Sequence, residues 1–161
     1  MGFVIRPFES TDAEALAPVY LESARHHAAL DPVRYLVPDR DRVIRRYREQ
    51  RQHPEGARAI TLVALDDEGV VRGFVDAWIQ WPTDIMHKPC RCCYIAELAV
   101  AESVRSHGIG ALLMAAIEEW GRKEGAEMAL LEYNANNPRA AAFYQHRLAY
   151  HPGSHMVLKW L

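Results

Sequence analysis

Residues 94–110 read YIAELAVAESVRSHGIG, and the largely apolar run ALLMAAIEEW follows at once over residues 111–120. This order predicts a buried strand, a glycine turn and the start of a helix. Because Gly108 and Gly110 carry no Cβ, a turn there lets successive N–H groups point outward from the first turn of the helix. Those donors and the helix dipole favour an anionic ligand such as a pyrophosphate. The stretch therefore predicts a phosphate-binding turn in an α/β protein.

The spacing of this turn, Arg105-x-x-Gly108-x-Gly110, differs from two familiar phosphate motifs. Leu113 stands where the dinucleotide fingerprint has its third glycine, and no Gly-Lys-Ser/Thr follows as in a Walker A loop. Taken alone, the glycine pair is equally consistent with a tight strand-to-helix connection. A second motif is needed to decide between these readings.

That motif is residues 130–150, LLEYNANNPRAAAFYQHRLAY, which again predict a strand, a loop and a helix, with Asn137 as N-cap and Pro138 at the first helical position. The first block contains E-L-x-V and V-R-x-x-G-x-G-x-x-L-L, and the second contains L-E-x-x-x-x-N-x-x-A-x-x-F-Y. Together, at an interval that fits one helix and one strand, they resemble the GNAT superfamily of acyl-CoA N-acyltransferases. The resemblance covers residues 94–150.

The resemblance implies an α/β (α+β) fold: a mixed sheet of about six to seven strands with flanking helices, antiparallel at first and parallel at one central pair. It implies one N-acetyltransferase domain over residues 1–161. The two central parallel strands splay apart at a bulge, and the pantetheine of acetyl-CoA lies between them, bonded to the backbone near Leu98, Ala99 and Val100. The pyrophosphate then reaches the amides of Arg105, Ser106, His107, Gly108, Ile109 and Gly110.

The implied function is transfer of an acetyl group from acetyl-CoA to a primary amine. An alkyl amine with a pKa of about 10.4 is mostly protonated at neutral pH, so a base is needed. Glu97 and Glu132 are the candidates, with a water chain or a histidine as the alternative. Either glutamate could instead be a strand carboxylate paired with an arginine. Tyr144 matches the family tyrosine that lies near the thioester sulfur and protonates the departing thiolate, whereas Asn137 either binds the cofactor arm or serves only as an N-cap.

The cysteines are crowded into the motif H-x-x-C-x-C-C, formed by His87, Cys90, Cys92 and Cys93. A structural zinc site normally joins two separated ligand pairs, and this cluster has no second pair. We therefore expect no metal and interpret the cysteines as small apolar residues that begin a buried strand. They form no disulfide framework, which fits a reducing compartment.

Composition sets outer limits on function. The net charge of −2 and the pI of about 6.4 give no global attraction to nucleic acid, and no apolar run is long enough to span a bilayer. The arginines of residues 39–52 are interpreted as a solvated face with local ion pairs rather than as an anion-binding site. The first residues carry no secretory signal pattern. We expect a cytoplasmic protein with neither nucleic acid nor membrane as a partner.

Hydrophobic periodicity predicts the other elements. We expect strands at residues 3–8, 59–65, 70–80, 128–133 and 155–161, and helices at residues 13–29 and 39–52. The loop of residues 81–89 is expected to border the acceptor site. His26, His27 and Tyr35 are further candidates to line it.

The acceptor itself is predicted only as a class. A small-molecule amine is the first choice, and a protein N-terminus or lysine is the alternative. A non-catalytic acyl-CoA-binding sensor is a third hypothesis, since the motif glycines serve binding alone. The second motif ends in Leu148-Ala149-Tyr150 where the family usually has Leu-Gly-Phe, so the local bend is expected to differ. The tail beyond it is short, which suggests an open pocket or one completed by a second subunit in a homodimer.

Overall fold

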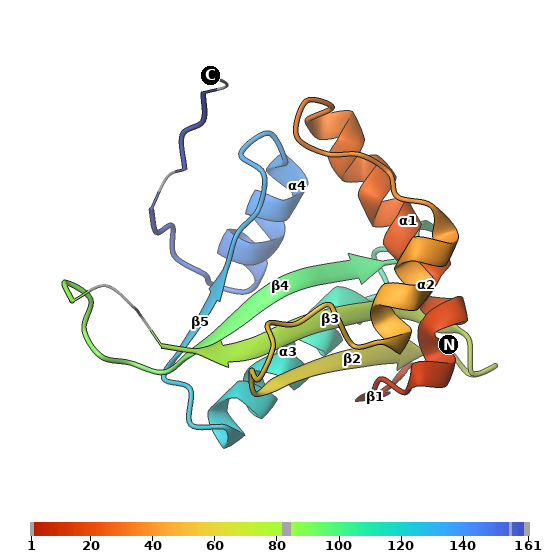
Figure 1. Ribbon diagram of the computed structural model, residues 1–161, viewed down its shortest axis with the longest axis horizontal. Helices are drawn as coiled ribbons and strands as arrows, with labels where there is room; N and C mark the ends of the chain where they lie inside the picture. The colour runs from red at the N-terminus through yellow and green to blue at the C-terminus, as the bar shows by residue number, and fades with distance from the viewer. Residues whose placement is uncertain (1, 82–84, 155, 160–161) are drawn as a thin grey trace.

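The computed structural model describes residues 2–81, 85–154 and 156–159 (Figure 1). The strands are β1 (Val4–Pro7), β2 (Ala59–Leu65), β3 (Val71–Gln80), β4 (Cys92–Val100) and β5 (Met128–Leu131). The helices are α1 (Ala13–Leu30), α2 (Arg40–Arg48), α3 (Ile109–Lys123) and α4 (Pro138–Ala141), which continues as a π-helical segment, η3 (Ala142–Arg147). Short 3-10 turns, η1 (Ser10–Asp12) and η2 (Glu102–Val104), precede α1 and the glycine turn. The sheet order is β1-β2-β3-β4-β5, antiparallel except for the parallel pair β4–β5.

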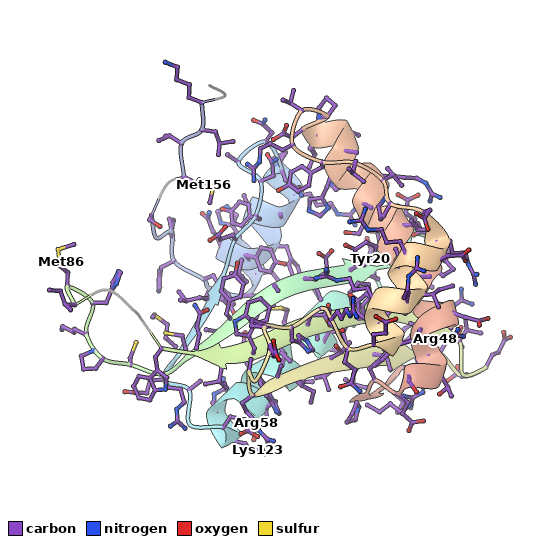
Figure 2. All side chains as sticks on the ribbon, viewed as in Figure 1. Tyr20, Arg48, Arg58, Met86, Lys123 and Met156 are labelled. Atoms are coloured by element: carbon purple, nitrogen blue, oxygen red, sulfur yellow. The ribbon has the colours of Figure 1, made fainter. Side chains whose placement is uncertain are left out.

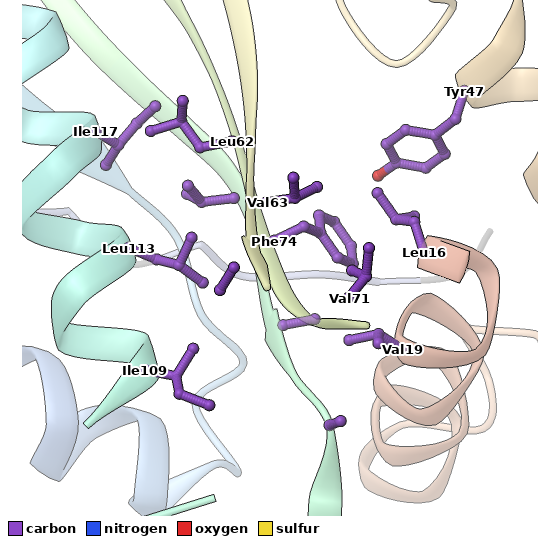
Figure 3. Close-up of a cluster of buried hydrophobic side chains, with 14 of the residues drawn as sticks. Leu16, Val19, Tyr47, Leu62, Val63, Val71, Phe74, Ile109, Leu113 and Ile117 are labelled. Atoms are coloured by element: carbon purple, nitrogen blue, oxygen red, sulfur yellow. The ribbon is translucent and has the colours of Figure 1, made fainter. Parts of the chain in front are cut away.

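Helix α3 covers one face of the sheet, and helices α1 and α2 cover the other (Figure 1). On the α3 side, Ile109, Leu113 and Ile117 recur every four residues and form one apolar stripe. All three are at most 1% exposed. Figure 3 shows them directed at the sheet, where Ile117 lies beside Leu62. This stripe attaches the helix that carries the glycine turn to the sheet.

An aromatic cluster fills the other face of the sheet. Phe74 of β3 is fully buried and lies edge-on to Tyr47 of α2, with 5.7 Å between the ring centroids. It also stacks on Tyr20 of α1 at 6.2 Å, and Figure 2 shows Tyr20 between that helix and the sheet. Aromatic pairs in these geometries add to the stabilisation from burial alone. The cluster holds α1 and α2 on the sheet face that carries Glu97.

The arginine-rich segment forms a shorter helix than predicted, Arg40–Arg48 instead of residues 39–52. Gln50 has a φ of 53°, and a right-handed helix cannot continue through that conformation. Arg48 forms an ion pair with Glu14 of α1. This contact is of the local kind expected for a solvated arginine face.

The predicted splay of the parallel strands is confirmed. Pairing between β4 and β5 ends at Ile95 and Leu131, although β4 continues to Val100. The register between β3 and β4 shifts at the same place, because Glu97 faces Asp76 while Ile95 faces Ala77. This bulge puts Glu97 and Ile95 on opposite faces of the sheet, although two residues of a regular strand so spaced share one face. Glu97 thereby comes to the face covered by α1.

The prediction of six to seven strands was too high, since the described residues form five. Residues 156–159 form no strand, and the rest of the predicted strand at 155–161 lies outside the described residues. Met156 is 64% exposed and stands away from the sheet (Figure 2). Strand β5 also ends at Leu131 instead of residue 133, because β4 has already turned away and offers no partner for its backbone. Residues 82–84 of the predicted acceptor loop lie outside the described residues as well.

Ala149 occupies the turn after η3, at the position where the family motif has glycine. Its φ is 58°, in the left-handed region that glycine adopts at little cost and alanine does not. The turn is nevertheless closed, because the N–H of Tyr150 donates to the carbonyl of Tyr144 at 2.9 Å. The turn is thus formed with alanine in a left-handed conformation, and a difference from the bend of the family motif stays a prediction.

Ala149→Gly is expected to raise the free energy of unfolding by about 0.5–1 kcal/mol, because relief of left-handed strain exceeds the extra chain entropy that glycine loses. The matched control is Ala141→Gly in α4, where φ is −55° and the same change should lower that free energy by about 0.5–1 kcal/mol. Urea denaturation of the three proteins measures both changes. If Ala149→Gly is no more stable than the parent, the turn is not strained.

Candidate active site

A cleft of about 500 Å³ lies where β4 and β5 part. Residues 95–100 of β4 form its floor, and α1 borders it opposite α4 and η3 (Figure 1). The turn before α3 and the first residues of that helix line one end, and residues 131–133 line it where β5 leaves the sheet. The cleft therefore joins the two motifs that are separate in the sequence.

The glycine turn forms the start of α3 at one end of this cleft. Gly108 is the N-cap with a φ of 85°, and no side chain caps the helix. A Cβ on Gly110 would lie 3.2 Å from the ring of Phe143 in η3, so the absence of a side chain also lets the two motifs meet. Arg105, Ser106, Gly108, Ile109 and Gly110 all line the cleft, whereas His107 does not. The His107 Nδ1 lies 3.0 Å from the carbonyl oxygen of Arg105.

Two arginines that sequence reasoning missed also line the cleft. Arg139 of α4 and Arg147 of η3 face the same cavity as Arg105. Neither Arg139 nor Arg147 has an acidic partner within 4 Å among the described residues. The signal that could have revealed them is their interval of eight residues within the second motif, since that interval places two side chains on one helical face. Their charges make this part of the cleft suitable for an anionic ligand.

The floor of the cleft is the unpaired edge of β4. Leu98, Ala99 and Val100 line it, and beyond Ile95 no strand pairs with that edge among the described residues. An open strand edge presents N–H and C=O groups that an extended ligand can bind as an added strand would. Arg105 Nε already donates to the carbonyl of Val100 at 3.1 Å, which links the strand to the glycine turn.

Glu97 lies half-buried in the middle of the cleft. Its Oε1 accepts a hydrogen bond from the Ser23 hydroxyl of α1 at 3.0 Å. Burial raises the pKa of Glu97 above its usual value, although His27 and the Ser23 hydroxyl both favour the ionised form. A carboxylate with a raised pKa is a better proton acceptor. Ser23 is a second residue that the motifs did not identify, because it belongs to a helix far away in the sequence.

Tyr144 of η3 faces the same cavity as Glu97. Burial and, secondarily, the charge of Glu97 raise the pKa of Tyr144 to about 12, so its phenol is protonated at neutral pH. Its ring packs against Tyr133 and Tyr150, with centroid distances of 5.8 Å and 6.0 Å. The Tyr144 hydroxyl makes no hydrogen bond within the described part of the chain, so it is available to a ligand.

The other candidates are placed less centrally. Glu132 lines the cleft but is exposed, and Tyr35 lies 5.4 Å from the ring of His27 without lining it. Asn137 lines the cleft and caps α4 by accepting from the Ala140 N–H at 3.0 Å. Its Nδ2 also lies 3.4 Å from Nε2 of His26, which connects α4 to α1 across the cleft. The N-cap interpretation of Asn137 is confirmed, and its position leaves the cofactor role open.

The cysteine cluster lies away from the cleft. Sγ atoms of Cys90 and Cys92 are 3.5 Å apart, and burial raises the pKa of Cys93 to about 11. No group of three His, Cys, Asp or Glu side chains within the described residues is arranged to hold a metal ion. Nor is any helix in the described ranges both long and apolar enough to cross a membrane.

Residues 21–150 match the family described as the acetyltransferase (GNAT) family. This match covers most of the chain, so the protein belongs to that family, and the resemblance drawn from the two motifs is confirmed. No curated protein matches the sequence. The protein is therefore an acetyltransferase by class, and its fold and its cleft are consistent with that class.

Solved structures with a similar fold include a tetramutant of the BH1408 protein from Bacillus halodurans, which is 21% identical with a TM-score of 0.86 over 98% of this chain and 99% of that one. The aminoglycoside N-acetyltransferase AAC(6')-Iy in complex with CoA is 19% identical, with a TM-score of 0.73 over 99% of this chain and 95% of that one. The aminoglycoside antibiotic 6'-N-acetyltransferase AAC(6')-Ih from Acinetobacter baumannii is 18% identical, with a TM-score of 0.73 over 99% of this chain and 98% of that one. Likeness at these identities shows the fold alone.

Proposed function

We propose that this protein uses acetyl-CoA to acetylate the primary amine of a small molecule, with residues 1–161 acting as one domain in the cytoplasm. The observation that carries the proposal is the convergence of Glu97 and Tyr144 in one cleft with the uncapped start of α3. These features provide a proton acceptor, a hydroxyl donor and an anion-binding end. A sensor that only binds acyl-CoA would need the last of them alone.

The chemistry assigns one task to each group. The N–H groups after Gly108 and the arginines around them hold the diphosphate, and the open edge of β4 holds the extended arm. Glu97 takes a proton from the ammonium group, directly or through water, and the neutral amine attacks the thioester carbonyl. A C–N bond forms, the C–S bond breaks, and the amide product loses its remaining extra proton to solvent.

Tyr144 stabilises the leaving thiolate in this scheme. With a pKa of about 12, its phenol holds its proton more tightly than a thiol with a pKa of about 8.5. Donation of a hydrogen bond to the developing thiolate is therefore favoured over complete proton transfer. The product thiol obtains its proton from solvent, and the rate gain from the tyrosine is modest.

A small-molecule acceptor is supported by the concave shape of the cleft, which is typical of such sites, and by structural neighbours that are named as aminoglycoside N-acetyltransferases. A protein N-terminus or lysine is the second candidate acceptor. Steady-state assays with aminoglycosides, polyamines, amino acids and short peptides distinguish the two. A homodimer, which would complete the acceptor side of the cleft, is tested by sedimentation velocity of the same samples.

Gly110→Val is expected to weaken binding of CoA at least about 10-fold, because the new side chain meets Phe143 and covers the amides at the helix start. The matched control is Gly153→Val, where a Cβ has no atom within 4 Å and affinity should not change. Calorimetric titration measures both affinities, and thermal melting verifies that each variant is folded. Unchanged CoA affinity in a folded Gly110→Val variant would contradict the phosphate site.

A further inference from the structure

Asp76 is a buried carboxylate to which the reaction scheme assigns no task. It lies in the middle of β3 and is 3% exposed. Its two oxygens accept hydrogen bonds from the Tyr47 hydroxyl at 2.7 Å and from the Thr61 hydroxyl at 2.6 Å. No lysine or arginine of the described residues lies within 4 Å, and the nearest basic atom is Nε2 of His53 at 3.8 Å. A carboxylate buried without a cationic partner is costly to ionise.

Asp76 is also the cross-strand partner of Glu97, immediately beside the bulge. Side chains directly opposite on neighbouring strands point to the same face, with Cβ atoms about 4.5–5.5 Å apart. The bulge is what puts Glu97 on this face. In a regular register that continued from the pair Ala77–Ile95, Asp76 would be paired with residue 96, and Glu97 would point to the opposite face. Two carboxyl groups so placed disfavour each other's ionisation.

The hydrogen bonds around Asp76 are compatible with both of its protonation states. When Asp76 is ionised, Thr61 donates to it and accepts from Nε2 of Gln52 at 3.1 Å. When Asp76 is protonated, it can donate to Thr61, whose hydroxyl can then turn to Nε2 of His53 at 3.5 Å. A proton can thus be held here with the oxygens of Asp76 and the hydroxyl of Thr61 still hydrogen-bonded, whereas the neighbouring Oε1 of Gln52 has no hydrogen-bond partner among the described residues.

We propose that Asp76 is a positioning residue for the transfer reaction: Asp76 and Glu97 titrate as one coupled pair, and the charge on Asp76 controls when Glu97 ionises. This inference rests on the proposed role of Glu97 as the base. Burial raises the pKa of Asp76 to about 7, with the charge of Glu97 adding to that shift, and burial raises the pKa of Glu97 as well. The effect of Asp76 on Glu97 is inferred from their cross-strand placement. Repulsion between the two carboxylates brings the pKa of the base closer to neutral pH, where general bases work best.

Other titratable or charged groups face the pair from every surrounding element: Tyr20 and His27 of α1, Arg46 and Tyr47 of α2, His53 of the following loop, and Tyr144 of η3. Arg46 favours ionisation of both carboxyl groups, and His27 favours that of Glu97. For each carboxyl group, burial raises the pKa by more than these cations lower it. The cations therefore reduce the rise in the two carboxyl pKa values, but they leave the two carboxyl groups side by side.

Carboxyl ¹³C NMR titration of the full chain tests the proposal without any acceptor. In Asp76→Asn, the midpoint of Glu97 is expected to fall by at least about 0.5 pH unit, and in Glu97→Gln the midpoint of Asp76 should fall likewise, because coupling is reciprocal. The matched control is Asp66→Asn. Asp66 is a buried carboxylate in the β2–β3 turn and pairs with Arg72 of β3. This change should leave the titration midpoint of Glu97 unchanged.

Unchanged midpoints in both variants would overturn the proposal, and the reciprocal measurement decides the matter if Asp76→Asn does not fold. The acidic limb of the profile of kcat/KM against pH is a second readout. It should move to lower pH in Asp76→Asn, since Glu97 would then ionise earlier. A shift by NMR with an unmoved limb would support the coupled pair and would overturn the role of Glu97 as base.

Discussion

Glu97→Gln is expected to lower kcat about 100-fold or more, the lower end of what a positioned general base contributes. Glutamine has nearly the same shape and can still accept the hydrogen bond from Ser23, but it cannot take a proton from the amine. The affinity for acetyl-CoA should therefore stay within about 2-fold of the parent, an amount that corresponds to less than about 0.5 kcal/mol. Steady-state kinetics and calorimetry measure the two quantities separately.

Glu132→Gln is the matched control for this prediction, because Glu132 lines the same cleft but is exposed. It should change kcat much less than Glu97→Gln does. Tyr144→Phe should fall between them with a loss of about 10-fold, the rate equivalent of one hydrogen bond of about 1.4 kcal/mol. If Glu132→Gln is the more damaging of the two glutamine variants, the base is assigned to the wrong strand.

Leu113→Ala is expected to lower the free energy of unfolding by about 2–5 kcal/mol, because it empties a fully buried site between α3 and the sheet. Figure 3 shows Leu113 in the middle of the apolar stripe, between Ile109 and Ile117. The same helix begins at Gly108, so loosening its attachment should also weaken CoA binding. Urea denaturation gives the stability, and titration with CoA gives the affinity.

Leu112→Ala provides the control from the adjacent position on α3. Its side chain is 47% exposed, and the change should cost less than about 1 kcal/mol. The two variants differ only in which face of the helix is truncated. Equal losses would mean that α3 is not held to the sheet by the stripe.

Much of the cofactor end of the site follows from local sequence. A strand, a glycine turn and an apolar helical stripe are set by neighbouring residues, so the quoted stretch predicts the uncapped start of α3 correctly. The same holds for Asn137 as an N-cap. The strained turn at Ala149 is also indicated by sequence, because alanine stands there in place of the glycine of the family motif.

The parts that local sequence could not predict depend on contacts between distant segments. Ser23 reaches Glu97 only because α1 packs across β4, and the two residues are 74 positions apart. The pairing of Asp76 with Glu97 depends on a bulge that shifts the register by one residue, and no periodicity in either strand reveals it. The strand count was too high because alternation in residues 156–159 predicts a strand without saying which edge would pair with it.

The most direct test of the central claim is calorimetric titration of the protein with acetyl-CoA and CoA, followed by thiol-release assays with the panel of amines. The account predicts micromolar binding of both and thiol release with at least one small-molecule amine, lost in Glu97→Gln. Binding of neither acetyl-CoA nor CoA would contradict the claim that the cleft between β4 and β5 holds an acyl donor.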